Sequence, residues 1–332
     1  MKQLFGGLLG LMLLAGCAGT AGEPDGGTMM RQDAGPFDAG PQPIKYTRYT
    51  LRADGWPANA RLKGAAVLDN VLFVATDQGL LSLPATDTRW APVTTPLMGD
   101  VKPTSLDRFD QALVMTAAGA AGGGLYVKSL DADWTQVTGA PTTPSWTLVK
   151  KSTEWLLATT GGLFKATALT GPWGRRSAMN TPLFAMPVTR FVAAPAQQKL
   201  FATNATGGLF ESNDVGATWT TSALRGTVDA IAAQGAYVLV STSMNGQQRS
   251  DNYGNTFRPA MAPITDGVLF YVAQGTDFWA GGTFGLQSSS DNGATFSANS
   301  NGLPTGTAVR GLFFAGSYAI ADTAAGPYIT QP

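Results

Sequence analysis

The sequence predicts an all-β protein, a seven-bladed β-propeller built from four-stranded antiparallel blades. Three observations support this prediction. A β-rich hairpin recurs seven times, aromatic residues follow most hairpins at intervals of roughly 40 residues, and no helical periodicity persists from residue 44 onward. Four short strands at a period near 40 residues are typical of a propeller blade. We therefore expect residues 44–332 to form one closed ring.

The first 16 residues predict export. Lys2 precedes an apolar stretch over residues 4–15, which has the length of a signal-peptide core and is too short to cross a bilayer. The segment Leu14-Ala15-Gly16-Cys17 resembles the lipobox of bacterial lipoproteins, and Cys17 is the chain's only cysteine. The resemblance implies cleavage of residues 1–16, acylation of Cys17 and a lipid anchor in the membrane of the cell envelope. An ordinary secretory signal with an incidental cysteine is the alternative.

Residues 17–43 predict a flexible tether that begins at the acylated Cys17. The segment is rich in Gly and Pro and nearly free of large apolar side chains. Such a segment buries too little apolar surface to offset the entropy of ordering. We expect it to hold the globular part away from the membrane. Ala18, which follows Cys17, favours the outer membrane as the location, on its periplasmic or surface side.

The repeated hairpins are clearest in the segments that begin at Val71, Glu154 and Lys199. Each has a β-rich run that ends in Ala-Thr, a short turn that contains glycine, and a second β-rich run. An apolar run precedes most hairpins, and a short segment headed by an aromatic residue follows, which gives four strands per unit. The aromatic residues at this last position are Trp90, Trp134, Trp173, Trp219, Phe257 and Phe296.

The two ends of the repeat region are complementary. The last unit stops after residues 326–330 without a fourth strand, whereas the first unit is preceded by a strand-like segment at residues 45–51. An open ring would leave unpaired strand edges. We therefore expect residues 45–52 to form the outer strand of the last blade and to close the ring.

Residues 212–219, 250–257 and 289–296 share the pattern Ser-x-Asp-x-Gly-x-Thr-aromatic, with Asn in place of Asp in the second copy. They resemble the Asp-box (BNR) repeats of sialidase-like propellers. The resemblance implies that each copy lies between the third and fourth strands of a blade, opposite the usual ligand face. The patterned residues are Ser212, Asp214, Gly216, Thr218, Trp219, Ser250, Asn252, Gly254, Thr256, Phe257, Ser289, Asp291, Gly293, Thr295 and Phe296.

The residue types of this pattern predict a structural role. Asp and Asn side chains accept hydrogen bonds from backbone N–H groups in turns, and Gly tolerates positive φ. Each copy supplies too few oxygen ligands for Ca²⁺. We therefore interpret these residues as stabilising the blade and not as binding a ligand.

Composition excludes several functions. The 22 basic residues balance the 22 acidic ones, which argues against nucleic-acid binding. The absence of His and the single Cys argue against a metal site, and the sequence indicates no cofactor. Motifs for nucleophilic catalysis or for nucleotide binding are missing. These absences favour a non-enzymatic protein, which we expect to be monomeric.

Paired carboxylates would be the remaining route to catalysis, because they carry out glycoside hydrolysis. Sialidases of the similar family use an Arg triad, a Tyr–Glu pair and an Asp, but the three Glu residues here fall outside the ligand face. Asp77 and Asp322 are the one pair of carboxylates that we consider for hydrolysis, because the repeat places both on second-to-third-strand turns of neighbouring blades. Turn formation is the alternative role of both residues.

Binding needs rigid loops and a few anchors. The loops that enter the first strands and those that join second to third strands should share one face of the ring. We expect that face to bind a ligand, with Trp56, Phe184, Arg225, Asn245 and Phe284 as candidate contacts. Three functions remain open: a binding or assembly module of the cell envelope, a divergent glycan-binding protein or glycoside hydrolase, and a passive surface protein. The ligand, an envelope protein or a glycan, stays unidentified.

Overall fold

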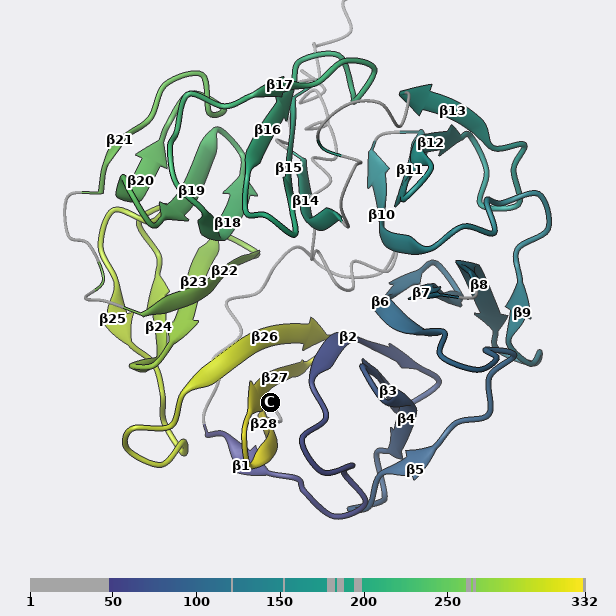
Figure 1. Ribbon diagram of the computed structural model, residues 1–332. Coiled ribbons are helices and arrows are strands. Elements are labelled where there is room, and N and C mark those ends of the chain that lie inside the picture. Colours follow the sequence, from purple (N-terminus) through teal and green to yellow (C-terminus); the bar gives the residue numbers. More distant parts are fainter. Residues whose placement is uncertain are drawn as a thin grey trace, which may run out of the picture.

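The computed structural model describes residues 48–120, 122–151, 153–177, 183, 188–193, 199–260, 264 and 267–330. Seven four-stranded antiparallel sheets form a ring (Figure 1), which confirms the predicted fold class. The seven innermost strands are β2 (Leu62–Leu68), β6 (Lys102–Phe109), β10 (Ser145–Lys151), β14 (Val188–Ala193), β18 (Val228–Gln234), β22 (Val268–Gln274) and β26 (Val309–Ala315).

The second and third strands of each blade form the repeated hairpin. These pairs are β3 (Val71–Thr76) with β4 (Gly79–Pro84), β7 (Ala112–Gly119) with β8 (Gly122–Ser129), β11 (Glu154–Thr159) with β12 (Gly162–Ala166), β15 (Leu200–Asn204) with β16 (Leu209–Ser212), β19 (Tyr237–Thr242) with β20 (Gly246–Ser250), β23 (Asp277–Gly282) with β24 (Gly285–Ser289), and β27 (Tyr318–Thr323) with β28 (Gly326–Thr330).

The outer strands are short. They are β5 (Ala91–Pro92), β9 (Thr135–Gln136), β13 (Gly174–Ser177), β17 (Thr220–Thr221), β21 (Arg258–Pro259), β25 (Ser297–Ala298) and β1 (Thr50–Leu51).

The N-terminal strand closes the ring, as predicted. Strand β1 pairs antiparallel with β28, with Thr50 opposite Ile329 and Leu51 opposite Tyr328, and the two strands lie side by side in Figure 1. The N–H of Arg52 extends this pairing to the carbonyl of Pro327. The last blade therefore combines strands from both ends of the chain, which leaves no unpaired edge on β28. Residues 45–47 of the expected strand lie outside the described residues.

The core lies between the blades. The described buried apolar side chains form seven clusters, and each cluster joins two neighbouring blades. One cluster combines Leu163 of β12 with Phe191 of β14, and another combines Trp90 of the first blade with Ile320 of the last. Stability is thus distributed around the ring, and each blade depends on its neighbours.

An aromatic residue directly precedes the outer strand of every blade. The six aromatic residues expected from the sequence all occupy this position, and Tyr49 holds it in the last blade, immediately before β1. Trp56 and Trp90 make an edge-to-face contact at 5.4 Å between ring centres, as do Phe201 and Phe257 of neighbouring blades at 6.4 Å. The N-terminal segment therefore supplies a complete outer edge, both its strand and its aromatic side chain.

Antiparallel pairing defines two faces. The upper face carries the connections into the innermost strands and the turns between second and third strands. The lower face carries the turns between first and second strands and the connections into the outer strands. Tyr49 precedes β1, so the chain enters the propeller from the lower face.

Candidate functional site

A β-bulge interrupts every innermost strand near its upper end. The register between first and second strands shifts by one residue in all seven blades, for example between Leu62 and Gly64. We call the seven extra residues the upper ring. Its members are Lys63, Thr104, Trp146, Thr189, Asp229, Leu269 and Arg310. Bulges re-aim side chains and are frequent beside functional sites.

Three members of the upper ring stand out by exposure. Lys63, Asp229 and Leu269 are each the one exposed residue of their innermost strand, while the neighbouring residues are buried or partly buried. The ring therefore presents a cation, a carboxylate and an aliphatic side chain on rigid strands. Such a mixture offers apolar contact with a few polar anchors, which suits binding.

Two other ring members connect neighbouring blades. The hydroxyl of Thr104 donates to the carbonyl of Ser145 at 2.7 Å, and Arg310 donates to the carbonyl of Ala60 at 3.3 Å. Both acceptors belong to the next blade. These contacts join the upper end of the second blade to the third and that of the last blade to the first.

The proposed acid pair lies beside the start of β2. An Oδ atom of Asp77 accepts the N–H of Arg61 at 2.9 Å, and Asp322 accepts a backbone hydrogen bond from Leu62. The prediction that Asp322 lies in a turn is wrong, because it is the penultimate residue of β27. Arg310 donates to its carboxylate at 2.8 Å. Burial nevertheless raises the pKa of Asp322, and Arg310 opposes that rise.

These contacts indicate that both carboxylates have structural roles. Asp77 fixes the backbone before β2, and Asp322 compensates the partly buried Arg310 guanidinium. Neither carboxylate lines any of three cavities found among the described residues, of about 850, 310 and 210 Å³.

The structure places the binding candidates predicted from the sequence in different environments. Trp56 and Phe284 are partly buried and pack against interblade clusters, so they are core-edge residues. Arg225 and Asn245 are exposed and come together, because the N–H of Arg225 donates to Asn245 Oδ1 at 2.6 Å. Phe184 lies outside the described residues, as does Cys17. Sequence reasoning missed the upper ring, because its members share a backbone irregularity and no residue type.

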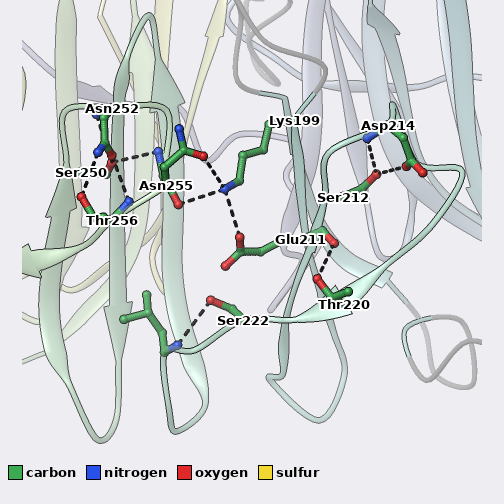
Figure 2. Close-up of polar contacts among 12 residues, drawn as sticks. Lys199, Glu211, Ser212, Asp214, Thr220, Ser222, Ser250, Asn252, Asn255 and Thr256 are labelled. Atoms are coloured by element: carbon green, nitrogen blue, oxygen red, sulfur yellow. Dashed lines mark hydrogen bonds and ion pairs between the residues drawn. The ribbon is translucent and has the colours of Figure 1, made fainter.

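The three box segments lie between third and fourth strands, as expected. Figure 2 shows two of them, around Asp214 and Asn252. Ser212 Oγ donates to Asp214 Oδ1 and accepts the N–H of Gly216, both at 2.7 Å, and Asp214 accepts from the N–H and hydroxyl of Thr218. The third segment repeats this arrangement. The second segment differs in one bond, because the side-chain amide of Asn252 donates to the hydroxyl of Thr256. The serine and the acid or amide thus satisfy each turn internally.

The box glycines also meet the preceding blade. Gly216 has φ +80° and Gly254 has φ +74°, a backbone region that favours glycine. A Cβ atom on Gly216 would collide with Leu163, and one on Gly254 would collide with the ring of Phe201. The box segments are therefore part of the contact between blades.

A cationic side chain of the preceding blade binds each box segment. Arg176 donates to the carbonyls of Asp214 and Val215, Lys199 to that of Gly254, and Arg249 to that of Asn292. Figure 2 shows Lys199 between Glu211 and Asn255. These hydrogen bonds span the same blade interfaces as the apolar clusters. The box segments therefore contribute to packing between neighbouring blades.

Two absences concern only the described residues. They include no group of three or more acidic, Cys or His side chains that could hold a metal ion. They also contain no helix long and apolar enough to span a membrane.

The comparisons with known proteins support the propeller fold but do not identify a function. No family model and no curated protein matches the sequence. Among solved structures, the chain is similar to YCF48 from Cyanidioschyzon merolae, with a TM-score of 0.62, 12% identity and coverage of 86% of this chain and 98% of that one. It is similar to YCF48 bound to D1 peptide, with a TM-score of 0.61, 12% identity and coverage of 86% and 97%.

An enzyme is also among the similar structures. A catalytically inactive histidine-to-alanine variant of virginiamycin B lyase from Staphylococcus aureus, solved with quinupristin, has a TM-score of 0.61, 10% identity and coverage of 85% of this chain and 97% of that one. At such identities these similarities show the propeller fold alone. One fold carries both binding proteins and enzymes, so function must be argued from the site.

Proposed function

We propose that this chain is a lipid-anchored propeller of the cell envelope that binds a protein partner at the upper ring without turnover. The observation that carries the proposal is the bulge in every innermost strand, which leaves Lys63, Asp229 and Leu269 exposed on stiff strands. The resemblance of residues 14–17 to a lipobox supports the envelope location, and Ala18 supports the outer membrane. The entry of the chain from the lower face supports a partner on the opposite, upper face.

Chemistry supports binding over catalysis. The two acids considered for hydrolysis are engaged by Arg61, Leu62 and Arg310, and the chain has no His to serve as a general base. The similar lyase has a histidine whose replacement inactivates it, so that enzyme's chemistry does not transfer to this sequence. YCF48 with D1 peptide and BBS1 with ARL6 are similar propellers that bind a peptide or a protein, which supports a protein ligand here.

Leu269 and Leu51 provide a matched test. They are 41% and 40% exposed, but Leu269 belongs to the upper ring and Leu51 to the outer edge. A photo-crosslinking amino acid placed at position 269 in growing cells should yield one discrete protein adduct, whereas position 51 should not. The substitutions Lys63→Ala and Asp229→Ala together should reduce the yield. Equal adducts at both positions, or none at position 269, would contradict the proposal.

A second candidate function is glycan binding or hydrolysis, which the Asp-box resemblance of the three box segments favours. Turnover of fluorogenic glycosides that disappears in Asp77→Asn with Asp322→Asn would establish it. We expect no turnover in either protein, because Asp322 is held by Arg310.

A further inference from the structure

A cavity of about 210 Å³ lies between the last blade and the first, which are neighbours in the ring (Figure 1). Its walls come from residues 48–52, from the hairpin of the first blade with the segment after it, and from the hairpin of the last blade. The cavity therefore forms only when the ring is closed. It lies toward the lower face, because its lining includes the last residue of β4 and the first residue of β27.

Two arginines line this cavity from one face of the N-terminal segment. Side chains alternate along an extended chain, so Arg48 and Arg52 share one side of it with Thr50, and all three line the cavity. Tyr49 points to the other side, where it is buried in the cluster between the sixth and last blades. The register of the closing strand thus directs both guanidinium groups toward the first blade.

The backbone at both arginines is fixed on either side. The N–H of Tyr49, directly after Arg48, donates to the carbonyl of Asn301 at 2.9 Å. The N–H of Arg52 donates to the carbonyl of Pro327 at 2.9 Å, and its own carbonyl accepts the indole N–H of Trp90 at 2.9 Å. The two cations therefore start from an ordered strand, which lowers the entropic cost of binding an anion.

The cavity carries more positive than negative charge. Neither Arg48 nor Arg52 forms an ion pair or a side-chain hydrogen bond with any other described residue. Asp87 is the one acid in the lining, and it accepts the N–H groups of Arg89 and Thr88 at 3.1 and 2.7 Å. These two bonds, with the charge of Arg89, hold the pKa of Asp87 below its usual range. The lining thus combines two unpaired cations with one carboxylate that its own turn already engages.

The remaining wall is mostly aliphatic. Leu72, Leu83 and Ile329 line the cavity and are at most 8% exposed, while Tyr318 and Thr50 contribute hydroxyl-bearing side chains. Guanidinium groups match the planar, bidentate geometry of a carboxylate. The volume lies below the roughly 300–1,000 Å³ of pockets for drug-sized ligands, so the cavity suits a small molecule or one terminal group of a larger one.

We propose that this cavity binds a carboxylate carried by a short aliphatic group. Arg48 and Arg52 would donate to the carboxylate oxygens, and the aliphatic group would pack against Leu72, Leu83 and Ile329. A dianionic phosphate would exceed the net charge of the lining and would leave the aliphatic wall uncovered. The cavity lies outside the upper ring, so this proposal does not rest on the function proposed for the ring.

The test titrates the full chain with 4-methylpentanoate by isothermal titration calorimetry. The matched control ligand is 4-methylpentanamide, which has nearly the same shape without the charge and should bind at least about tenfold more weakly. Acetate should also bind at least about tenfold more weakly, because it lacks the aliphatic group. Bound 4-methylpentanoate should raise the melting temperature, since the cavity is present only in the closed, folded ring.

Single substitutions locate the binding site. Arg48→Gln and Arg52→Gln should each weaken binding of 4-methylpentanoate about tenfold, because each removes a hydrogen bond to a charged group. Arg258→Gln is the matched control, since it also removes one positive charge from an outer strand. Arg258 belongs to the fifth blade, is 61% exposed and lines none of the three cavities, so its loss should leave the affinity unchanged.

Two further ligands decide the class and source of the anion. Inorganic phosphate that binds more tightly than 4-methylpentanoate would overturn the proposal. So would equal binding of the amide, equal loss in Arg258→Gln, or no binding of 4-methylpentanoate by the wild type. N-acetylleucine presents the same aliphatic carboxylate as a peptide terminus, so binding tighter than that of 4-methylpentanoate identifies a chain end as the source, and weaker binding a free acid. None of these variants alters the upper ring, so the crosslink at position 269 reports separately.

Discussion

The amino group of Lys199 lies 3.1 Å from the carboxylate of Glu211, and their side chains are only 6% and 17% exposed. The same amino group donates to the carbonyl of Gly254 in the next blade at 3.0 Å. It also lies 5.2 Å from the centre of the Phe201 ring. This one cation therefore joins a charge of its own blade to the backbone of its neighbour.

Removing the acid from this pair should destabilise the protein. Glu211→Ala leaves the buried Lys199 without its counter-charge, and we expect a loss of about 3 kcal/mol in the free energy of unfolding, measured by urea denaturation. Glu154→Ala is the control, because its partner Lys165 is 39% exposed and such pairs contribute about 0–1 kcal/mol. Equal losses in the two variants would show that burial of the pair is unimportant.

The acid of the third box segment should make stability depend on pH. Burial favours the neutral form of Asp291, but hydrogen bonds from Thr295, Ser289 and Ala294 outweigh it and lower its pKa to about 2. Because the folded pKa lies below the unfolded value, this stabilisation is complete above about pH 4 and is lost as the pH falls through 2.

Asp291→Asn tests this dependence, since Asn252 already occupies the equivalent position in the second box segment. The wild type should have the higher urea midpoint at pH 5, and the difference should shrink at pH 2.5. Asp69→Asn is the control, because Asp69 receives no such hydrogen bonds from the described residues. A difference that is constant between the two pH values would refute this assignment.

The aromatic residues before the outer strands should differ in importance. Trp90 is 1% exposed, and its indole N–H donates to the carbonyl of Arg52 at 2.9 Å, whereas Trp219 is only partly buried. We expect Trp90→Ala to cost about 3–5 kcal/mol and Trp219→Ala less, near 3 kcal/mol. Chemical denaturation of both variants measures the order, and the reverse order would contradict the burial argument.

Closure of the ring predicts how truncations behave. Deleting residues 18–53 removes β1 and Tyr49 and leaves the outer edge of β28 unpaired, so we expect a lower melting temperature and aggregation by size-exclusion chromatography. Deleting residues 18–43 spares β1 and should leave both properties unchanged. Identical melting of the two truncated chains would remove the support for closure.

Membrane attachment through Cys17 is tested by cell fractionation. The wild type should sediment with membranes, and Cys17→Ser should release the protein into the soluble fraction, because the acyl chains supply the membrane affinity. A wild type found free in the periplasm or medium would contradict the lipid anchor.

The sequence by itself determined the seven blades, the hairpins and the closing strand. Short β-rich runs, turn glycines and a period near 40 residues can be recognised within single repeat units, without knowledge of which units pack together. The box segments were equally readable, because their hydrogen bonds join residues two to four positions apart, as between Ser212 and Gly216. The sequence does not predict the role of Tyr49 as the aromatic residue of the last blade, because Tyr49 lies outside the repeat period and at the opposite end of the chain from the blade that it completes.

Only the tertiary structure decided which side chains form the upper ring. A bulge depends on the register between two strands and not on residue type, so Lys63, Asp229 and Leu269 share no sequence signal. The repeat pattern predicts a turn at Asp322, whereas the structure places it in β27. Its contacts with Arg310 and with the backbone of Leu62 join residues that are distant in the sequence, so no local pattern indicates them.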